Sequence, residues 1–152
     1  MNEVRPLLLA QQHGAGVIAG VLGWGFLELL DAAISFREQT APWLLWLLPL
    51  GAFVIAAVMH HWGGRSKEGT KLVVAAARGD ERVGFIPARM SAIILFGTVA
   101  GHFFGASVGR EGAAVQITGS LAETLARPLN LSAEARRTLL IACIAGGFGA
   151  LF

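Results

Sequence analysis

The chain has 152 residues, of which 55% are hydrophobic and 14% are charged, and its mean hydropathy is +0.62. Soluble domains have about a quarter of their residues charged, so this composition excludes an ordinary soluble domain and favours a membrane protein. The net charge of +2 is too small to favour nucleic acid, and the single cysteine, Cys143, excludes an intrachain disulfide and a thiolate metal site.

The first two apolar segments have the length of transmembrane helices, for which about 20 residues suffice. Residues 14–36 form the first, and we expect Glu28 and Asp31 in its C-terminal half to face protein or the membrane interface. Residues 42–62 form the second, which carries no charge and has tryptophans at both ends, as is typical of interfacial anchors. The sequence therefore predicts two membrane crossings joined by a short turn.

A polar connection, residues 63–89, follows the second crossing and holds a short predicted helix at residues 70–78. It contains six Lys or Arg residues, whereas the turn between the two crossings has only Arg37. Basic residues concentrate in cytoplasmic loops. Because two crossings return the chain to its starting side, we expect the N-terminus and residues 63–89 to be cytoplasmic.

A third apolar segment, residues 90–107, follows the connection, and the two segments after it, residues 112–126 and Ala133 to the end, are short for independent crossings. Tilted or re-entrant helices buried within a larger protein explain such lengths. The chain is therefore predicted to be an all-α, multi-pass membrane protein with tilted and partial-depth helices.

Glycine recurs every fourth residue across the third segment, at Gly97, Gly101, Gly105 and Gly109. Three overlapping GxxxG units on one helix form a flat face that a second helix can approach closely. This spacing predicts a helix-packing seam that runs from Gly97 to Gly109.

The stretch GREG, residues 109–112, places Arg110 and Glu111 between glycines in apolar surroundings. A helix that starts near Arg110 leaves its first backbone N–H groups without intrahelical partners, and the helix dipole adds partial positive charge there. An anion can bind at such an end. The Glu111 carboxylate can occupy the same place when ionised and leave it when protonated.

Two other interpretations of this stretch remain open on physical grounds. An Arg110–Glu111 pair that caps a helix end at the membrane interface explains the residue types equally well. A nucleotide-phosphate loop is less suitable, since GASVGREG lacks the Walker spacing and the Lys-Ser/Thr ending.

GREGAAVQITGS, residues 109–120, resembles the GREGPxVQIG signature of the CLC family of chloride channels and anion/proton antiporters. Ala113 replaces the proline that is usual in chloride-transporting members, and residues 65–74 stand where those members have GSGIPE. With the GGFGALF ending, these departures look more like the bacterial fluoride/proton antiporter branch. Chloride transport, by a channel or a chloride/proton antiporter, is the alternative.

The resemblance implies a transporter rather than an enzyme, with no cofactor or metal, in the cell membrane of a bacterium. Its partners would be fluoride or chloride, protons, the lipid bilayer and, at full length, a second subunit of a homodimer. Glu111 would be the gating and proton-transferring residue, and Thr70 the hydroxyl nearest to the family's anion-binding serine. The anion-binding residues implied are Gly109, Arg110, Gly112, Ala113 and Thr70.

CLC subunits consist of two inverted halves, so residues 1–152 are expected to form a single, incomplete transmembrane domain whose second half is absent. A truncated membrane remnant that does not transport is the alternative. We further predict that Arg110 orients its loop through hydrogen bonds to backbone carbonyls. His102 is predicted to be a hydrogen-bonded packing residue, and Gln116 to form a hydrogen bond between helices.

Overall fold

The computed structural model describes residues 4–40 and 42–152, which form helices, turns and loops without a β-strand. The α-helices are, in chain order, α1 (Val4–Thr40), α2 (Leu48–Trp62), α3 (Thr70–Ala77), α4 (Arg89–Phe103), α5 (Arg110–Ala126) and α6 (Ala133–Gly149). Short 3-10 turns lie at Pro42–Leu47, Gly64–Glu68, Glu81–Val83 and Arg127–Leu129. The predicted all-α fold class is confirmed.

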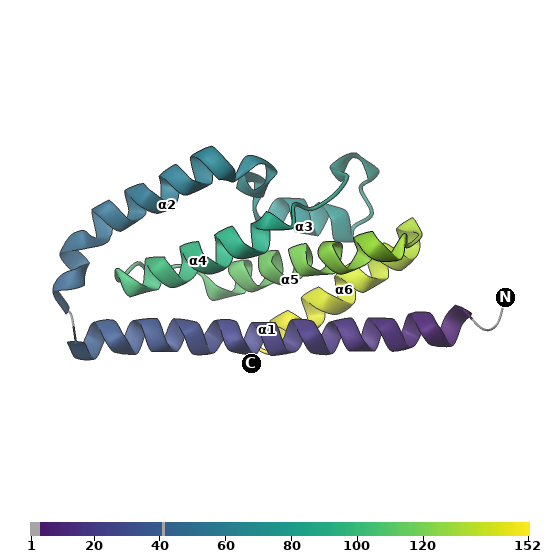
Figure 1. Cartoon of the computed structure of the whole chain (residues 1–152), viewed down its shortest axis with the longest axis horizontal. Coiled ribbons are helices and arrows are strands. Elements are labelled where there is room, and N and C mark those ends of the chain that lie inside the picture. The colour runs from purple at the N-terminus through teal and green to yellow at the C-terminus, as the bar shows by residue number, and fades with distance from the viewer. Residues whose placement is uncertain (1–3, 41) are drawn as a thin grey trace.

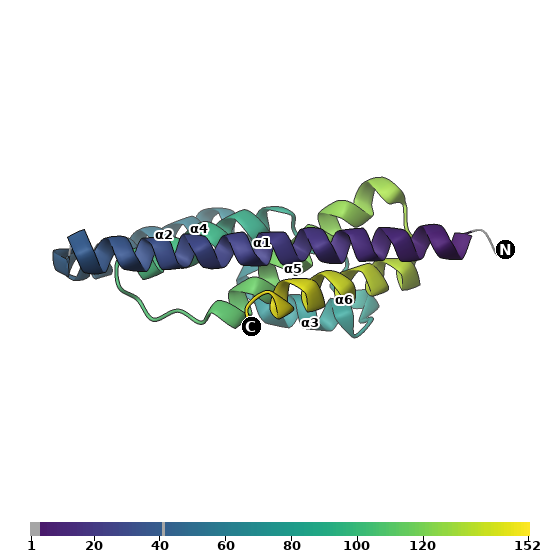
Figure 2. The same ribbon diagram turned by 90° about the horizontal axis from the view of Figure 1, so that it is seen from below.

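Helix α1 runs along the length of the molecule; α4, α5 and α6 contact it, and α2 and α3 lie farther from it (Figure 1). Helix α2 packs mainly on α4, and α4 lies antiparallel to α5. Helix α6 crosses α1 at an angle (Figure 1) and lies alongside it in the view from below (Figure 2), and it also packs along α5. Helix α5 contacts α1, α3, α4 and α6, so it is the central helix of the bundle.

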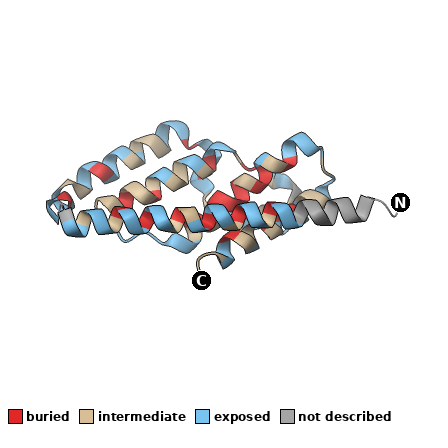
Figure 3. Cartoon of the chain, turned by 60° about the horizontal axis from the view of Figure 1, so that its bottom comes forward, coloured by how far each residue is buried: buried red, intermediate tan, exposed pale blue. Residues whose placement is uncertain are grey.

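Two buried apolar clusters hold α5 in this central position. The larger cluster joins α1, α3, α4, α5 and α6 around Leu72, Met90 and Cys143. The smaller cluster packs two α1 side chains against the first turns of α5; its buried members are Phe26, Leu30, Ala113, Ala114 and Ile117. Buried residues accordingly form a stripe along the side of α1 that faces the bundle, whereas α2 is largely exposed (Figure 3).

Two helical stretches, His13–Gln39 and Pro42–Trp62, are long and apolar enough to cross a membrane, and they lie where the two crossings were predicted. Only 11% of the apolar window in Pro42–Trp62 is buried, so the described residues leave most of the apolar surface of α2 uncovered. Helices α4, α5 and α6 have 15, 17 and 17 residues. These lengths are below the roughly 20 residues of an upright crossing, in agreement with the partial-depth helices predicted for the segments that form α5 and α6; the short length of α4 was not predicted.

The predicted glycine seam from Gly97 to Gly109 is wrong, because α4 ends at Phe103. Gly105 has a φ of 94°, which few residues other than glycine adopt. The Gly105 N–H donates to the His102 carbonyl at 2.9 Å, and the Ala106 N–H donates to the Gly101 carbonyl at 2.8 Å. These two bonds form a Schellman motif, which terminates the helix. The four-residue spacing therefore crosses a helix end, and only Gly97 and Gly101 share a helix.

Close glycine packing occurs instead where α1 crosses α6. A Cβ atom placed on Gly146 would overlap the carbonyl oxygen of Gly16, and one placed on Gly23 would lie 2.8 Å from the carbonyl oxygen of Gly147. The two backbones are therefore in direct contact, as in other membrane helix pairs with small residues at the interface. This crossing sets the distance between α1 and α6.

We expect Gly146→Ala to destabilise the protein, because the added methyl group forces α1 and α6 apart. Overpacking of this kind costs about 1–3 kcal/mol, measured as a lower thermal unfolding temperature in detergent. Gly25→Ala is the matched control, since nothing lies within 4 Å of a Cβ atom at Gly25. Equal unfolding temperatures for the two variants would contradict the close contact.

Candidate anion-binding site

Helix α5 starts at Arg110, as predicted, after the non-helical segment 105–109. Gly109 is the N-cap residue in an extended conformation, with φ −65° and ψ 120°, and no side chain caps the helix. The first N–H groups of an α-helix have no acceptor within the helix. Nothing lies within 4 Å of a Cβ atom placed on Gly109, so no neighbouring group covers that position of the helix start.

Glu111 lies in the first turn of α5, and both it and Arg110 are exposed. Within the described residues, neither side chain forms a hydrogen bond or an ion pair. The Arg110–Glu111 capping pair, which was the alternative interpretation, is therefore absent from the described part of the chain. The hydrogen bonds predicted from Arg110 to backbone carbonyls are also not formed among these residues, so its guanidinium is free to interact with an anion.

Ala113 faces the opposite way from this opening. Its side chain is buried against Phe26 and Leu30 of α1. In an α-helix that starts at Arg110, Ala113 is also the first residue whose N–H has an intrahelical acceptor. The methyl group of Ala113 thus fixes the start of α5 on α1, while the free N–H groups belong to residues 109–112.

Thr70, the first residue of α3, lies beside the start of α5 although 41 residues separate it from Glu111. The side-chain Nε2 of Gln116 donates to Thr70 Oγ1 at 3.1 Å and to the Gly112 carbonyl oxygen at 3.0 Å. A Cβ atom placed on Gly112 would lie 3.5 Å from Thr70 Oγ1. The predicted hydrogen bond of Gln116 between helices is confirmed.

Two helix N-termini therefore meet at this place. Gly69, the N-cap of α3, has a φ of 61° and, like Gly109, provides no side-chain cap. The helix dipoles of α3 and α5 both contribute partial positive charge, although in α3 the N–H groups of Gly69 and Leu72 already donate to the carbonyls of Ser66 and Gly69. Such a place suits an anion that does not require a fully charged partner.

His102 lies near the end of α4 and is buried. Its Nδ1 lies 2.8 Å from the carbonyl oxygen of Thr98, which fixes Nδ1 as the protonated nitrogen because a carbonyl only accepts. The predicted packing role of His102 is confirmed.

A second charged cluster, which was not predicted, lies near the other end of α5. The Glu123 side chain is 2% exposed, and its Oε2 accepts two hydrogen bonds from Arg136, at 2.9 Å and 2.7 Å. Its Oε1 is buried without a hydrogen-bond partner among the described residues. Glu123 is the only acidic residue between Gly112 and Ala126 in the sequence. An isolated acidic residue in an apolar segment is the sequence feature from which a buried ion pair could have been predicted.

Arginines from three elements hold the linker between α3 and α4 by three successive carbonyl groups. Arg136 donates to Gly84 at 2.7 Å, while the carbonyl oxygens of Phe85 and Ile86 accept hydrogen bonds of 3.3 Å from Arg65 and Arg127 respectively. The guanidinium of Arg136 also lies 4.6 Å from the centre of the Phe85 ring, within cation–π distance. These contacts hold the linker against three elements: α6, the turn after α5 and the turn before α3.

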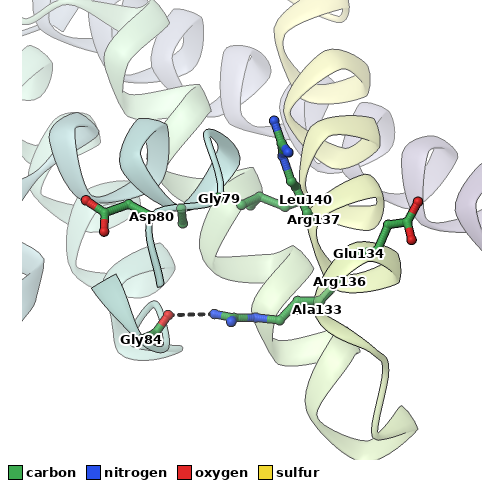
Figure 4. Close-up of a pocket in the computed structure, with 9 residues that line it drawn as sticks. Gly79, Asp80, Gly84, Ala133, Glu134, Arg136, Arg137 and Leu140 are labelled. Carbon is green, nitrogen blue, oxygen red and sulfur yellow. Dashed lines mark hydrogen bonds between the residues drawn. The ribbon is translucent and has the colours of Figure 1, made fainter. Parts of the chain in front are cut away.

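The bond from Arg136 to Gly84 crosses one side of a cavity of about 260 Å³ between this linker and the start of α6 (Figure 4). Asp80, Glu134 and Arg137 also line it, so its walls carry both signs of charge. Glu123, which bonds Arg136, is twelve residues beyond Glu111, about 18 Å along the helix. The cavity is therefore separate from the opening at Glu111.

Two membrane-length helical stretches, and two helix N-termini that meet at the start of α5, are features also found in membrane transport proteins with discontinuous helices. A family model described as "Voltage gated chloride channel" matches residues 51–152. The chain belongs to this family, the CLC family, whose members are transporters or channels and not enzymes.

Two relatives agree with this assignment. A protein of Pseudomonas syringae pv. tomato, named "Chloride/fluoride channel protein", is 40% identical over 141 residues, which are 91% of this chain and 30% of the relative. A solved structure described as a CLC-type fluoride/proton antiporter superposes with a TM-score of 0.88 at 31% identity, over 100% of this chain and 38% of that one. The chain thus spans about a third of the length of the relatives it matches.

We expect Arg136→Leu to destabilise the protein strongly, because it leaves the Glu123 carboxylate buried and unpaired. Breaking a buried ion pair from one side costs about 3–5 kcal/mol, to be measured by thermal unfolding in detergent. The double variant Glu123→Leu/Arg136→Leu should recover most of this loss. Arg137→Leu is the control, since it removes only a 2.7 Å hydrogen bond to the Ala77 carbonyl and should cost less.

Proposed function

We propose that the complete protein exchanges fluoride for protons, and that the anion and the Glu111 carboxylate compete for the N-terminus of α5. The observation that carries this proposal is the uncapped N-terminus of α5 at residues 109–112, where Gly112 lies beside the Thr70 hydroxyl. The likeness to a CLC-type fluoride/proton antiporter supports the choice of fluoride and of exchange.

Charge balance at this helix end provides the mechanism. The partial positive charge of the N-terminus stabilises one negative group, which is either the ionised Glu111 or a bound anion. Both together would repel each other at short range. Protonation of Glu111 removes its charge and releases it from the site, which the anion then fills. The uptake of a proton from one side of the membrane is thereby coupled to the binding of an anion from the other side.

The other predicted residues support this cycle in different ways. Gly109 and Gly112 lack side chains that would cover the N–H groups, so the anion can approach the backbone. The exposed guanidinium of Arg110 attracts anions to the opening over a longer range. Ala113 contributes by its packing on α1, which holds the start of α5 in place, and Thr70 contributes a hydroxyl from the second helix end.

The name of the Pseudomonas relative includes chloride, so chloride transport is the second candidate. We further propose that residues 1–152 are the first part of a longer transport domain that forms a homodimer in the bacterial inner membrane. The fraction of each relative that the chain covers supports this proposal. With the N-terminus in the cytoplasm, the arginine-rich linker would lie on the cytoplasmic side, as the distribution of basic residues favours.

The test uses the protein expressed from its complete reading frame and reconstituted into proteoliposomes. We expect Glu111→Gln to abolish proton movement driven by a fluoride gradient, because an amide does not take up and release a proton. A fluoride electrode and a pH electrode report the two fluxes, and potassium chloride in place of potassium fluoride distinguishes the two candidate anions.

Glu134→Gln is the matched control for this experiment. Glu134 is also an exposed glutamate in the first turn of a helix, but its helix, α6, has the Ser132 hydroxyl as a cap. The control should transport fluoride and protons as the unmodified protein does. Proton-coupled flux that survives in Glu111→Gln would remove Glu111 from the mechanism.

A further inference from the structure

Gln116 joins the two helix ends that form the proposed site. Its side chain is partly buried, and its Nε2 has two hydrogens, which match two acceptors: Thr70 Oγ1 at 3.1 Å and the Gly112 carbonyl at 3.0 Å. One acceptor belongs to α3 and the other to the first turn of α5. A single amide group thus holds the start of α3 against the start of α5.

The partners fix the orientation of this amide. A carbonyl oxygen only accepts hydrogen bonds, so the Gln116 atom beside the Gly112 carbonyl is the nitrogen and not the oxygen. The same nitrogen contacts Thr70 Oγ1, and Thr70 is therefore the acceptor in that bond. The Gln116 Oε1 lies toward Gly69, where a Cβ atom would be 3.7 Å away.

This direction of donation determines what the Thr70 hydroxyl can do. A hydroxyl group has one hydrogen to donate, and no acceptor for that of Thr70 lies among the described residues. Because Gln116 occupies the acceptor side, the Thr70 hydrogen is available to an anion at the start of α5. A hydroxyl that accepts one bond is also polarised into a stronger donor.

We propose that Gln116 is a positioning residue that sets the preference for fluoride over chloride, by keeping the Thr70 hydroxyl oriented and polarised as an anion donor. This inference rests on the proposed function of the site. Fluoride is smaller than chloride and accepts stronger hydrogen bonds, so it gains more from an oriented donor. A brace that was only structural would affect both anions equally.

The experiment measures the binding of potassium fluoride and potassium chloride to the full-length protein by isothermal titration calorimetry. Gln116→Met keeps the length of the side chain and removes both N–H donors. We expect it to weaken fluoride binding on the order of tenfold, the effect of losing one well-placed hydrogen bond to a charged group, and to weaken chloride binding clearly less. An equal loss for the two anions would overturn the proposal.

A double-mutant cycle shows whether Gln116 acts through Thr70. Thr70→Val removes the hydroxyl and should reduce the fluoride preference by a similar factor. The double variant Gln116→Met/Thr70→Val should then lose no more than either single variant, whereas additive losses would show that Gln116 acts independently of Thr70 and would overturn the proposal. If Gln116→Met does not fold, Thr70→Val alone carries the test, because an unchanged fluoride preference in it overturns the proposal.

Thr118→Val is the matched control, since the Thr118 hydroxyl donates within its own helix, to the Ala114 carbonyl at 2.8 Å. It should leave the fluoride-to-chloride ratio unchanged. The proposed function fails separately: an unmodified protein that binds neither anion contradicts both proposals. Fluoride binding together with loss of proton flux in Glu111→Gln, but an unchanged ratio in Gln116→Met, contradicts only the role of Gln116.

Discussion

The uncapped N-terminus of α5 is the feature on which the arrangement of the other helices depends. An unsatisfied helix N-terminus attracts negative charge, and no side chain among the described residues caps this one. The surrounding contacts hold this end open rather than covering it. Ala113 fixes it on α1, and Gln116 joins it to α3 without occupying the N–H groups of residues 109–112.

Small residues bring α5 close enough to its neighbours for these contacts to form. A Cβ atom on Gly119 would lie 2.5 Å from a methyl group of Val73 in α3, and one on Gly147 of α6 would overlap the Thr118 side chain. The linker that follows α3 is fastened separately, by the arginines that bind the carbonyls of residues 84–86 and by the Ser120 hydroxyl, which donates to the Pro87 carbonyl at 2.7 Å. The close packing of α3 on α5 fixes α3, and the arginine contacts fix the linker that follows it. Together they determine where Thr70, the first residue of α3, lies beside α5.

The sequence predicted most of what depends on local chemistry. The start of α5 at Arg110, the short helix α3 and the two membrane-length stretches are where the glycines, charges and apolar runs indicated. The glycine seam was wrong because residue spacing does not show that Gly105 has a positive φ and ends α4. The pairing of Glu123 with Arg136 was missed because it requires α5 and α6 to be antiparallel neighbours, which no local pattern specifies. The proximity of Thr70 to Gly112 followed only from the family resemblance.

The two glutamates of α5 show why Glu111 rather than Glu123 suits a moving charge. Glu123 is buried and accepts two hydrogen bonds from Arg136, so its release would leave an unpaired guanidinium beside the linker. Glu111 has no such partner among the described residues and lies at an end of the helix that attracts negative charge. A carboxylate that alternates with an anion must be held by a field that the anion can equally satisfy. A helix N-terminus supplies such a field, whereas a dedicated arginine would hold the carboxylate permanently.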